Sequence, residues 1–212
     1  MAWKRSEKIW YRWGHFLCFV LTYSLFRPKI KGKSNLPKTG AYLITPNHRS
    51  LFDIPVLGCA TFRPLRFMAK KDLFKSKFIK WYFETNGSFS VDRDEGDPAA
   101  VKKAINYLKN GDVIVIFPEG GRRRKSHIDE LATGVGFIAA KTKVPIIPVG
   151  ISGLDKPFKK PRLPSRPRVI IGDPITSHIS MDGKTSEISN ALLSELSEKM
   201  QSLYEESLNE NF

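Results

Sequence analysis

A histidine and an aspartate five residues apart are the first candidates for chemistry in this sequence. His48 and Asp53 follow a short apolar segment that ends in Pro46, and Pro55 stands just beyond them. Proline is tolerated in the first turn of a helix and aspartate is a favoured N-cap, so we expect Asp53 to cap a helix. His48 then lies in the strand-to-helix loop, where its imidazole can meet the carboxylate. A histidine whose tautomer is held by a carboxylate is suited to general-base catalysis.

The same segment also permits a structural interpretation. Asp53 would then act only as a cap, and Ser50 with Asp53 has the spacing of a capping box. A covalent mechanism through Ser50 is less attractive, because no Gly-x-Ser-x-Gly elbow surrounds it. The segment alone leaves the catalytic and the structural interpretations open.

A second candidate site follows the most apolar strand that the sequence predicts. Glu119 and Gly120 come directly after it, and Gly121 and a run of four cations (122–125) follow. Ligands of open α/β sheets bind at the carboxyl ends of strands, glycines let the backbone approach an anion, and arginines offer bidentate donors to phosphate. A solvated basic loop is the alternative. The position after a buried strand favours an anion site.

Two further segments belong to the pattern. Arg93 ends the segment 90–93, with carboxylates on either side, and such an arginine is by itself typical of a surface ion pair. Residues 144–148 form an apolar strand between prolines and carry no reactive group. This last segment can only shape a pocket.

Alternating strands and helices must position these residues. Such alternation predicts an α/β fold with a mostly parallel or mixed central sheet flanked by helices. The expected strands are 41–45, 65–69, 88–91, 112–117, 145–150 and 168–172, and the expected helices are 53–61, 74–84, 98–109, 131–143 and 185–208. The strand at 112–117 is apolar throughout, which predicts a central position with both faces buried. Residues 153–167 are rich in Pro, Lys and Arg and are expected to form a basic surface loop.

The N-terminal segment has two interpretations. We expect residues 1–34 to form a helix and a basic linker, and residues 35–212 to form the main domain. The apolar run 16–26 is too short to cross a bilayer, which needs about 20 apolar residues. The aromatic and cationic residues around it suit a lipid headgroup region, which favours interfacial docking. The alternative is an amphipathic helix that packs on the core through Ile9, Trp13, Phe16 and Val20.

The amino-acid composition limits which kinds of molecule the protein is expected to bind. The 212 residues carry a formal net charge of +14, which predicts attraction to nucleic acid, anionic lipid or phosphorylated small molecules. The sequence contains no zinc-finger or aromatic RNA-binding motif, so we expect no nucleic-acid partner. Two cysteines without CxxC spacing argue against a disulfide framework and a cysteine-held metal. We expect neither metal nor cofactor.

Taken together and in this order, the four segments resemble the glycerolipid acyltransferase family, in particular the 1-acylglycerol-3-phosphate (lysophosphatidate) acyltransferases. Residues 47–53, 90–93, 117–120 and 144–148 match the first to fourth family motifs. The resemblance spans residues 30–175 and implies a glycerol-3-phosphate acyltransferase-like fold.

The resemblance also implies roles for individual residues. It makes His48 the general base and Asp53 its partner. It implies substrate-phosphate binding by Arg93, Glu119, Gly120 and Arg122. The family commonly has Thr and then Arg-Ser after Glu-Gly, whereas this chain has Gly121, Arg122 and Arg123. This departure leaves the identity of the acceptor open.

The implied reaction moves an acyl group from acyl-CoA or acyl-carrier protein, as co-substrate, to the sn-2 hydroxyl of 1-acylglycerol 3-phosphate, giving phosphatidic acid. Because the lysophospholipid acceptor resides in membrane, the N-terminal helix becomes an amphipathic membrane-docking helix. We expect peripheral or monotopic attachment to an anionic surface, the cytoplasmic face of the cell membrane. The alternatives are another glycerolipid or lysolipid acceptor, or a non-catalytic basic domain that binds lipid or nucleic acid.

Overall fold

The computed structural model shows one mixed sheet. It describes residues 5–75, 77, 80–81, 83, 87–92, 97–123, 127–128, 131–155 and 166–209, the side chains of 5–10 aside. Within this part, seven strands are ordered β1-β7-β6-β2-β5-β3-β4. They span Lys29–Lys31 (β1), Tyr42–Pro46 (β2), Leu65–Lys70 (β3), Phe89–Val91 (β4), Val113–Val115 (β5), Ile146–Ser152 (β6) and Arg168–Ile171 (β7). Among neighbouring strands, β6 and β7 are antiparallel and the other pairs are parallel.

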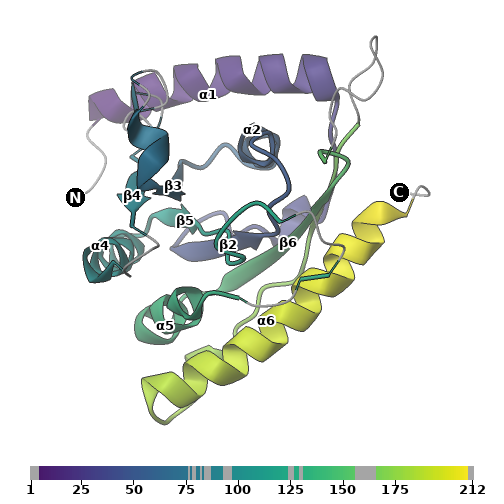
Figure 1. Cartoon of the computed structure of the whole chain (residues 1–212). Coiled ribbons are helices and arrows are strands. Elements are labelled where there is room, and N and C mark those ends of the chain that lie inside the picture. Colours follow the sequence, from purple (N-terminus) through teal and green to yellow (C-terminus); the bar gives the residue numbers. More distant parts are fainter. Residues whose placement is uncertain are drawn as a thin grey trace.

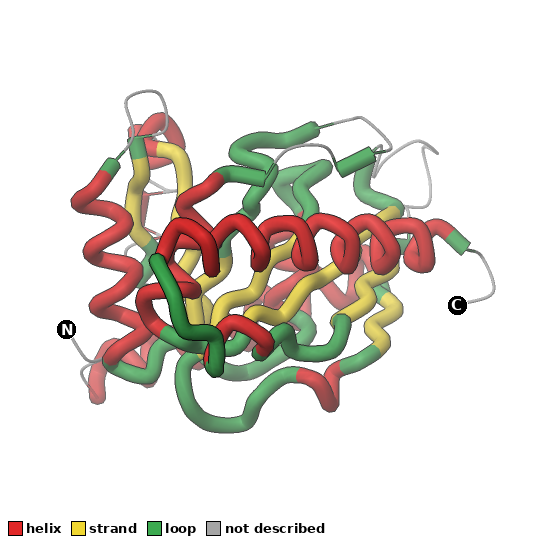
Figure 2. The backbone as a smooth tube through the Cα atoms, turned by 90° about the horizontal axis from the view of Figure 1, so that it is seen from below, coloured by secondary structure: helices red, strands yellow, loops and turns green. Residues whose placement is uncertain are grey.

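Helices cover both faces of the sheet. They span Arg5–Phe26 (α1), Asp53–Gly58 (α2), Pro98–Lys109 (α4), Thr133–Thr142 (α5) and Thr185–Leu208 (α6), with short 3-10 helices at Lys33–Asn35, Lys71–Lys75 and Ser177–Ile179. In Figure 1, α1 and α2 lie above the sheet, and α4, α5 and α6 lie below it. Figure 2 shows the long α6 running across the strands. This arrangement confirms the predicted mixed α/β sheet flanked by helices.

The alternation of side chains along the strands explains the two layers of core. On β2, Tyr42 and Ile44 belong to the apolar cluster beneath α1 and α2, whereas Leu43 belongs to the cluster above α4, α5 and α6. β5 repeats this pattern with Val113 and Ile114. Successive side chains of a strand point to opposite faces, so an apolar run supplies both cores at once. The apolar segment predicted at 112–117 is buried as expected, although the middle strand is β2.

Helix α6 is fixed closely on β6. A Cβ at Gly150 of β6 would collide with the backbone of Leu203 and Tyr204, so only glycine allows this approach. The buried stripe on α6 has helical spacing and consists of Ile188, Leu192, Leu196, Met200 and Tyr204. The C-terminal part of α6 is thereby held against the strand next to β2.

Two sequence expectations need correction, and two others fall partly outside the described residues. The segment expected to be a basic linker forms β1, which pairs with β7 at the sheet edge, where lysines are common. Helix 53–61 ends at Gly58. Parts of the expected helix 74–84 and of the expected loop 153–167 lie outside the described residues.

Helix α1 packs on the body through a different face from the one in the core-packing alternative. Its buried side chains are Tyr11, Thr22 and Phe26, whereas Trp13, Phe16 and Val20 of that alternative are exposed, and the side chain of Ile9 lies outside the described part. The hydroxyl of Tyr11 accepts a hydrogen bond from the Leu65 amide at 3.3 Å, which ties α1 to β3. Within the described chain, none of the helices is long and apolar enough to cross a membrane.

Candidate active site

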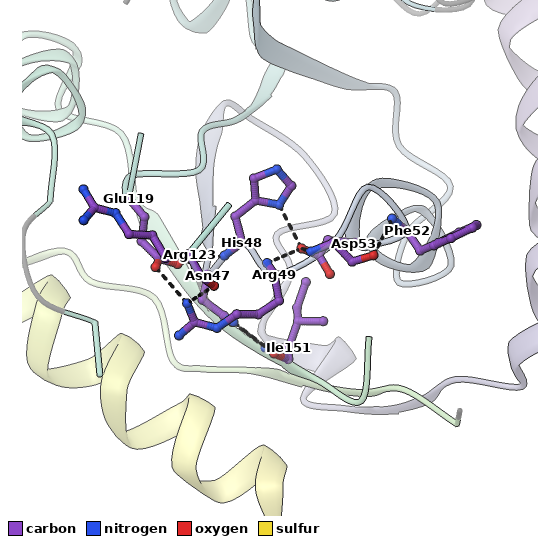
Figure 3. A network of polar contacts seen from close by, with 9 residues as sticks. Asn47, His48, Arg49, Phe52, Asp53, Glu119, Arg123 and Ile151 are labelled. Carbon is purple, nitrogen blue, oxygen red and sulfur yellow. Dashed lines mark hydrogen bonds and ion pairs between the residues drawn. The ribbon is translucent and has the colours of Figure 1, made fainter. Parts of the chain in front are cut away.

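The candidate active site lies where β2 ends and α2 begins. Asn47, the first residue after β2, is completely buried. Its Nδ2 donates to the Ile151 carbonyl at 3.0 Å, and its Oδ1 accepts from the Ile151 amide at 2.6 Å (Figure 3). The side chain therefore continues the pairing of β2 with β6 after the backbone has turned away. This contact directs the next residue, His48, over the carboxyl edge of the sheet.

His48 and Asp53 form the pair that their spacing predicts. His48 Nδ1 lies 2.8 Å from Asp53 Oδ2, and the aspartate is completely buried. The same oxygen accepts from the amides of Arg49 (2.7 Å) and Ser50 (2.9 Å). A carboxylate only accepts hydrogen bonds, so in the neutral form of the imidazole Nδ1 carries the proton and Nε2 has the free lone pair.

The expectation that Asp53 caps α2 is wrong. Asp53 is the first residue of α2, and the residue at the cap position is Phe52. The carboxylate turns back to the loop because the loop amides and the imidazole supply its donors. The Ser50 amide donates to Asp53 Oδ2, which resembles the carboxylate half of a capping box, whereas Ser50 Oγ accepts from the Phe52 amide at 3.3 Å and not from the Asp53 amide. The carboxylate that contacts His48 therefore also orders the loop before α2, and it does not cap the helix.

Aromatic rings hold the His48 loop on both sides. The Phe117 ring, after β5, stacks on the His48 ring with centroids 4.0 Å apart. Within the loop, the Phe52 ring contacts Phe26 at the end of α1, with centroids 5.1 Å apart. The imidazole is thus confined against an apolar surface.

Glu119 lies at the site but faces inward. Its Oε1 accepts from the His48 amide at 2.8 Å, and its Oε2 accepts from Arg49 Nη1 at 3.1 Å. Burial raises the pKa of this carboxyl above its ordinary value, against the effect of these donors. Both oxygens are occupied within the protein, so the phosphate-binding role implied for Glu119 does not fit. Glu119 instead contacts the backbone of the candidate base.

The remaining candidate phosphate ligands differ in their placement. Arg122 is exposed beyond the end of β5. Gly120 has φ +69°, which favours glycine, and its amide donates to the Phe117 carbonyl at 3.2 Å. Because the Gly120 amide already donates to the Phe117 carbonyl, direct phosphate binding by this amide is disfavoured. Arg93 lies outside the described residues.

Sequence reasoning missed one charged residue of the site. Arg49 is buried, with its guanidinium 4.7 Å from the centre of the Tyr204 ring on α6. Nothing in a single sequence indicates that an arginine next to a histidine, such as Arg49, will be buried. In the described part of the chain, no cluster of His, Cys, Asp and Glu side chains could hold a metal ion.

The fold and the site, a mixed α/β sheet with a His–Asp pair at its carboxyl edge, together indicate an enzyme that uses a general base. The family model described as "Acyltransferase" matches residues 27–152. The match covers more than half of the chain, which therefore belongs to the acyltransferase family.

Relatives in this family share a more specific name. The 1-acyl-sn-glycerol-3-phosphate acyltransferase of Bacillus subtilis is 30% identical over 186 residues, covering 82% of this chain and 90% of that protein. The enzyme of the same name from Streptococcus pneumoniae is 35% identical over 139 residues, covering 63% of this chain and 50% of that protein. The crystal structure of the 1-acyl-sn-glycerophosphate (LPA) acyltransferase PlsC from Thermotoga maritima has the same fold, with a TM-score of 0.66 and 24% identity. It matches 92% of this chain and 80% of that one.

Proposed function

We propose that the protein transfers an acyl group from an acyl thioester to the sn-2 hydroxyl of 1-acylglycerol 3-phosphate, giving phosphatidic acid. The observation that carries this proposal is the 2.8 Å contact between His48 Nδ1 and Asp53 Oδ2. It leaves Nε2 available to take the proton of a hydroxyl group. The names of the relatives from Bacillus subtilis and Streptococcus pneumoniae support the choice of acceptor.

The chemistry requires a base and positioning but no enzyme nucleophile, because a thioester is already activated. His48 Nε2 removes the hydroxyl proton while the acceptor oxygen attacks the thioester carbonyl. The tetrahedral intermediate then expels a thiolate, which receives the proton from the imidazolium. Asp53 stabilises the imidazolium, and a positioned base contributes on the order of 10² to 10⁴ in rate. Holding the two substrates together supplies much of the remaining acceleration.

For the acceptor phosphate we propose Arg122 and Arg93. Arg122 is exposed just beyond the end of β5, and the carboxyl end of that strand lies at the same sheet edge as His48. A guanidinium offers two parallel donors to a phosphate, which suits a phosphate monoester head. The role of Arg93 rests on the family resemblance of residues 90–93 alone.

We also propose that α1 docks on a membrane surface. Seven of its apolar side chains are at least 40% exposed: Trp13, Phe16, Leu17, Val20, Leu21, Tyr23 and Leu25. At 3.6 residues per turn, Trp13, Phe16, Leu17 and Val20 lie opposite the buried side chains of Tyr11, Thr22 and Phe26, and the other three residues lie on the flanks. Exposed apolar faces of this extent mark interaction sites, and a helix lying in the interface buries such a face in lipid. Docking there places a soluble body beside a membrane-resident acceptor.

The net charge, the two cysteines and the expected acyl donors favour the cytoplasmic side of the membrane. A net charge of +14 favours an anionic surface, where each suitably placed cation contributes about 1 kcal/mol. Neither Cys18 nor Cys59 forms a disulfide, which suits a reducing compartment. We therefore propose peripheral or monotopic attachment to the cytoplasmic face of the membrane, with acyl-CoA or acyl-carrier protein as donor.

An acceptor panel tests the proposed reaction. The purified chain is given labelled acyl-CoA or acyl-carrier protein with lysophosphatidate, glycerol 3-phosphate or lysophosphatidylcholine, and the lipid products are separated by chromatography. We expect labelled phosphatidic acid from lysophosphatidate and no product from the His48→Ala variant. Preference for another acceptor would replace the proposed substrate, and full activity of the variant would contradict the proposed base.

Vesicle flotation tests the docking of α1. We expect the Leu17→Ser/Leu21→Ser variant to lose most binding to vesicles that contain anionic phospholipid. The matched control is Leu208→Ser, because Leu208 on α6 is 46% exposed and lies outside α1. Equal binding of both variants would place the docking surface elsewhere.

A further inference from the structure

A second pair of opposite charges lies behind the His48 loop. Arg49 Nη1 and Glu119 Oε2 are 3.1 Å apart, and the two side chains are 1% and 3% exposed. The proposed acyl transfer uses neither side chain as a base or a substrate ligand. Burying two charges is costly, and such a pair often contributes little net stability. Its presence beside the candidate base therefore calls for another explanation.

The pair belongs to a network that holds the backbone of His48 from both sides. Glu119 Oε1 accepts from the His48 amide at 2.8 Å, while the His48 carbonyl accepts from the Arg123 amide at 3.0 Å. Arg49 Nη1 donates both to Glu119 Oε2 and to the Arg123 carbonyl, the latter at 2.6 Å. Arg49 thus links the two residues that hold His48, as Figure 3 shows.

Helix α6 covers this network. The buried Tyr204 ring faces the Arg49 guanidinium, with 4.7 Å between the guanidinium carbon and the ring centre. A cation over an aromatic face is attracted by the ring quadrupole, more strongly where water is excluded. The position of Tyr204 is fixed by the close approach of α6 to Gly150. The C-terminal helix thereby contributes to the order of a loop at the opposite end of the sequence.

We propose that Arg49 and Glu119 are positioning residues that fix the main chain of His48, while Asp53 fixes its imidazole. This inference rests on the proposed general-base role of His48. Asp53 determines which nitrogen carries the proton, and the Arg49–Glu119 pair determines where the ring stands above the sheet. Glu119 acts through the backbone of His48 and makes no contact with the acceptor phosphate.

The geometry requires both the charge and the shape of these side chains. The Glu119→Gln variant can still accept from one donor, but its amide NH₂ would then oppose the arginine or the His48 amide. The Arg49→Lys variant keeps the charge, but its ammonium group lacks the flat guanidinium that lies over the Tyr204 ring. Small errors in position are costly in catalysis, since a shift of about 1 Å can lower a rate about 100-fold.

Steady-state kinetics of full-length variants test the assignment. Once the wild-type reaction is established, kcat and the KM for lysophosphatidate are measured for Glu119→Gln, Arg49→Lys and Arg49→Gln. We expect kcat to fall by about 10- to 100-fold in Glu119→Gln, with acceptor KM within about twofold. Arg49→Lys should retain more kcat than Arg49→Gln. The split between kcat and KM distinguishes positioning from substrate binding.

An ion pair at the opposite edge of the sheet provides the control. Arg66 and Asp112 lie 3.0 Å apart at the amino ends of β3 and β5, with side chains that are 5% and 12% exposed. Asp112→Asn should lower the melting temperature without changing kcat. A raised acceptor KM with preserved kcat in Glu119→Gln would overturn the proposal, because Glu119 would then bind substrate. Unfolding of both Glu119→Gln and Arg49→Lys would also overturn it, because the pair would then serve the fold. An inactive wild type would instead refute the proposed function.

Discussion

Two clusters of an arginine, a carboxylate and a tyrosine lie at opposite edges of the sheet. Arg66, Asp112 and Tyr107 meet at the amino ends of β3 and β5. Arg49, Glu119 and Tyr204 meet beyond the carboxyl ends of β2 and β5. Both arginines are buried and both face an aromatic ring, so the same interactions occur in two places with different surroundings.

The two arginines differ in what they bind. Arg66 donates through Nε to Asp112 at 3.0 Å and through Nη1 to the Gly87 carbonyl at 3.1 Å, and its guanidinium lies 4.0 Å from the Tyr107 ring centre. Arg49 makes its two hydrogen bonds through Nη1 alone, and its buried Nε and Nη2 find no partner among the described residues. Unmet buried donors are costly. The cluster at the active edge is therefore less suited to stabilising the fold and better explained by its hold on His48.

The largest expected effect is a loss of turnover without a loss of stability, at the carboxyl edge of the sheet where His48 lies. The His48→Ala variant should lower kcat by a factor on the order of 10² to 10⁴, because the general base is lost. Its melting temperature should stay close to that of the wild type. Turnover measured with the best acceptor, together with thermal unfolding, checks both parts; near-normal turnover would refute the role of His48.

At the other edge we expect a large effect on stability alone. Asp112→Ala leaves the Arg66 guanidinium buried without its carboxylate, which should lower the free energy of unfolding by about 3 to 5 kcal/mol. The kcat of the folded fraction should not change. Denaturant titration and activity at low temperature measure the two quantities. A fall in kcat as large as that of Glu119→Gln would remove the distinction between the edges.

The acceptor site should respond through KM. Arg122→Ala should raise the KM for lysophosphatidate by a factor of about 10 to 150, which corresponds to the loss of a charge-assisted hydrogen bond worth about 1.5 to 3 kcal/mol. Lys102→Ala, an exposed cation on α4, is the control for net charge. Kinetics in detergent micelles separate this effect from membrane binding. Equal KM changes in both variants would indicate that the net positive charge attracts the acceptor, and not a specific phosphate site.

The tyrosines offer a finer test of the comparison. Tyr204→Leu should lower kcat several-fold, because the Arg49 guanidinium loses an attraction of up to about 2 kcal/mol. Tyr107→Leu removes the same kind of contact from Arg66 and should reduce only stability. Parallel measurements of kcat and melting temperature distinguish the two outcomes. A fall in kcat in the Tyr107 variant alone would contradict the assignment of roles.

The smallest expected effect is on the pH dependence of stability, and it involves a residue outside both clusters, His15. Burial lowers the pKa of His15 on α1, so the folded protein prefers the neutral imidazole. The stability that this preference represents is present above about pH 6.5 and is lost as the pH falls through the lowered folded-state pKa. Melting temperatures between pH 7 and pH 5 should therefore decline less in His15→Gln than in the wild type. Identical pH profiles would exclude His15 as a source of the decline.

Local patterns predicted the His48–Asp53 pair, because both residues lie in one short loop whose geometry follows from Pro55. The Arg49–Glu119 contact could not be predicted in this way. The two residues are 70 positions apart, and only the pairing of β2 with β5 brings them together. The face of α1 was also beyond prediction, because apolar residues surround that helix and its periodicity does not select one side. The strand β1 escaped notice because three residues with two lysines resemble a linker.

Asn47 has a consequence for the chemical lifetime of the protein. Its amide meets the Ile151 backbone with one donor and one acceptor, as a peptide group would. Spontaneous deamidation would convert this residue to aspartate, which keeps the acceptor but has no donor for the Ile151 carbonyl. A single hydrolysed amide would thus release the loop of the base without breaking the chain. The reaction begins when the His48 amide nitrogen attacks the Asn47 side-chain carbonyl and displaces ammonia, and the hydrogen bond of that amide to Glu119 Oε1 opposes this step.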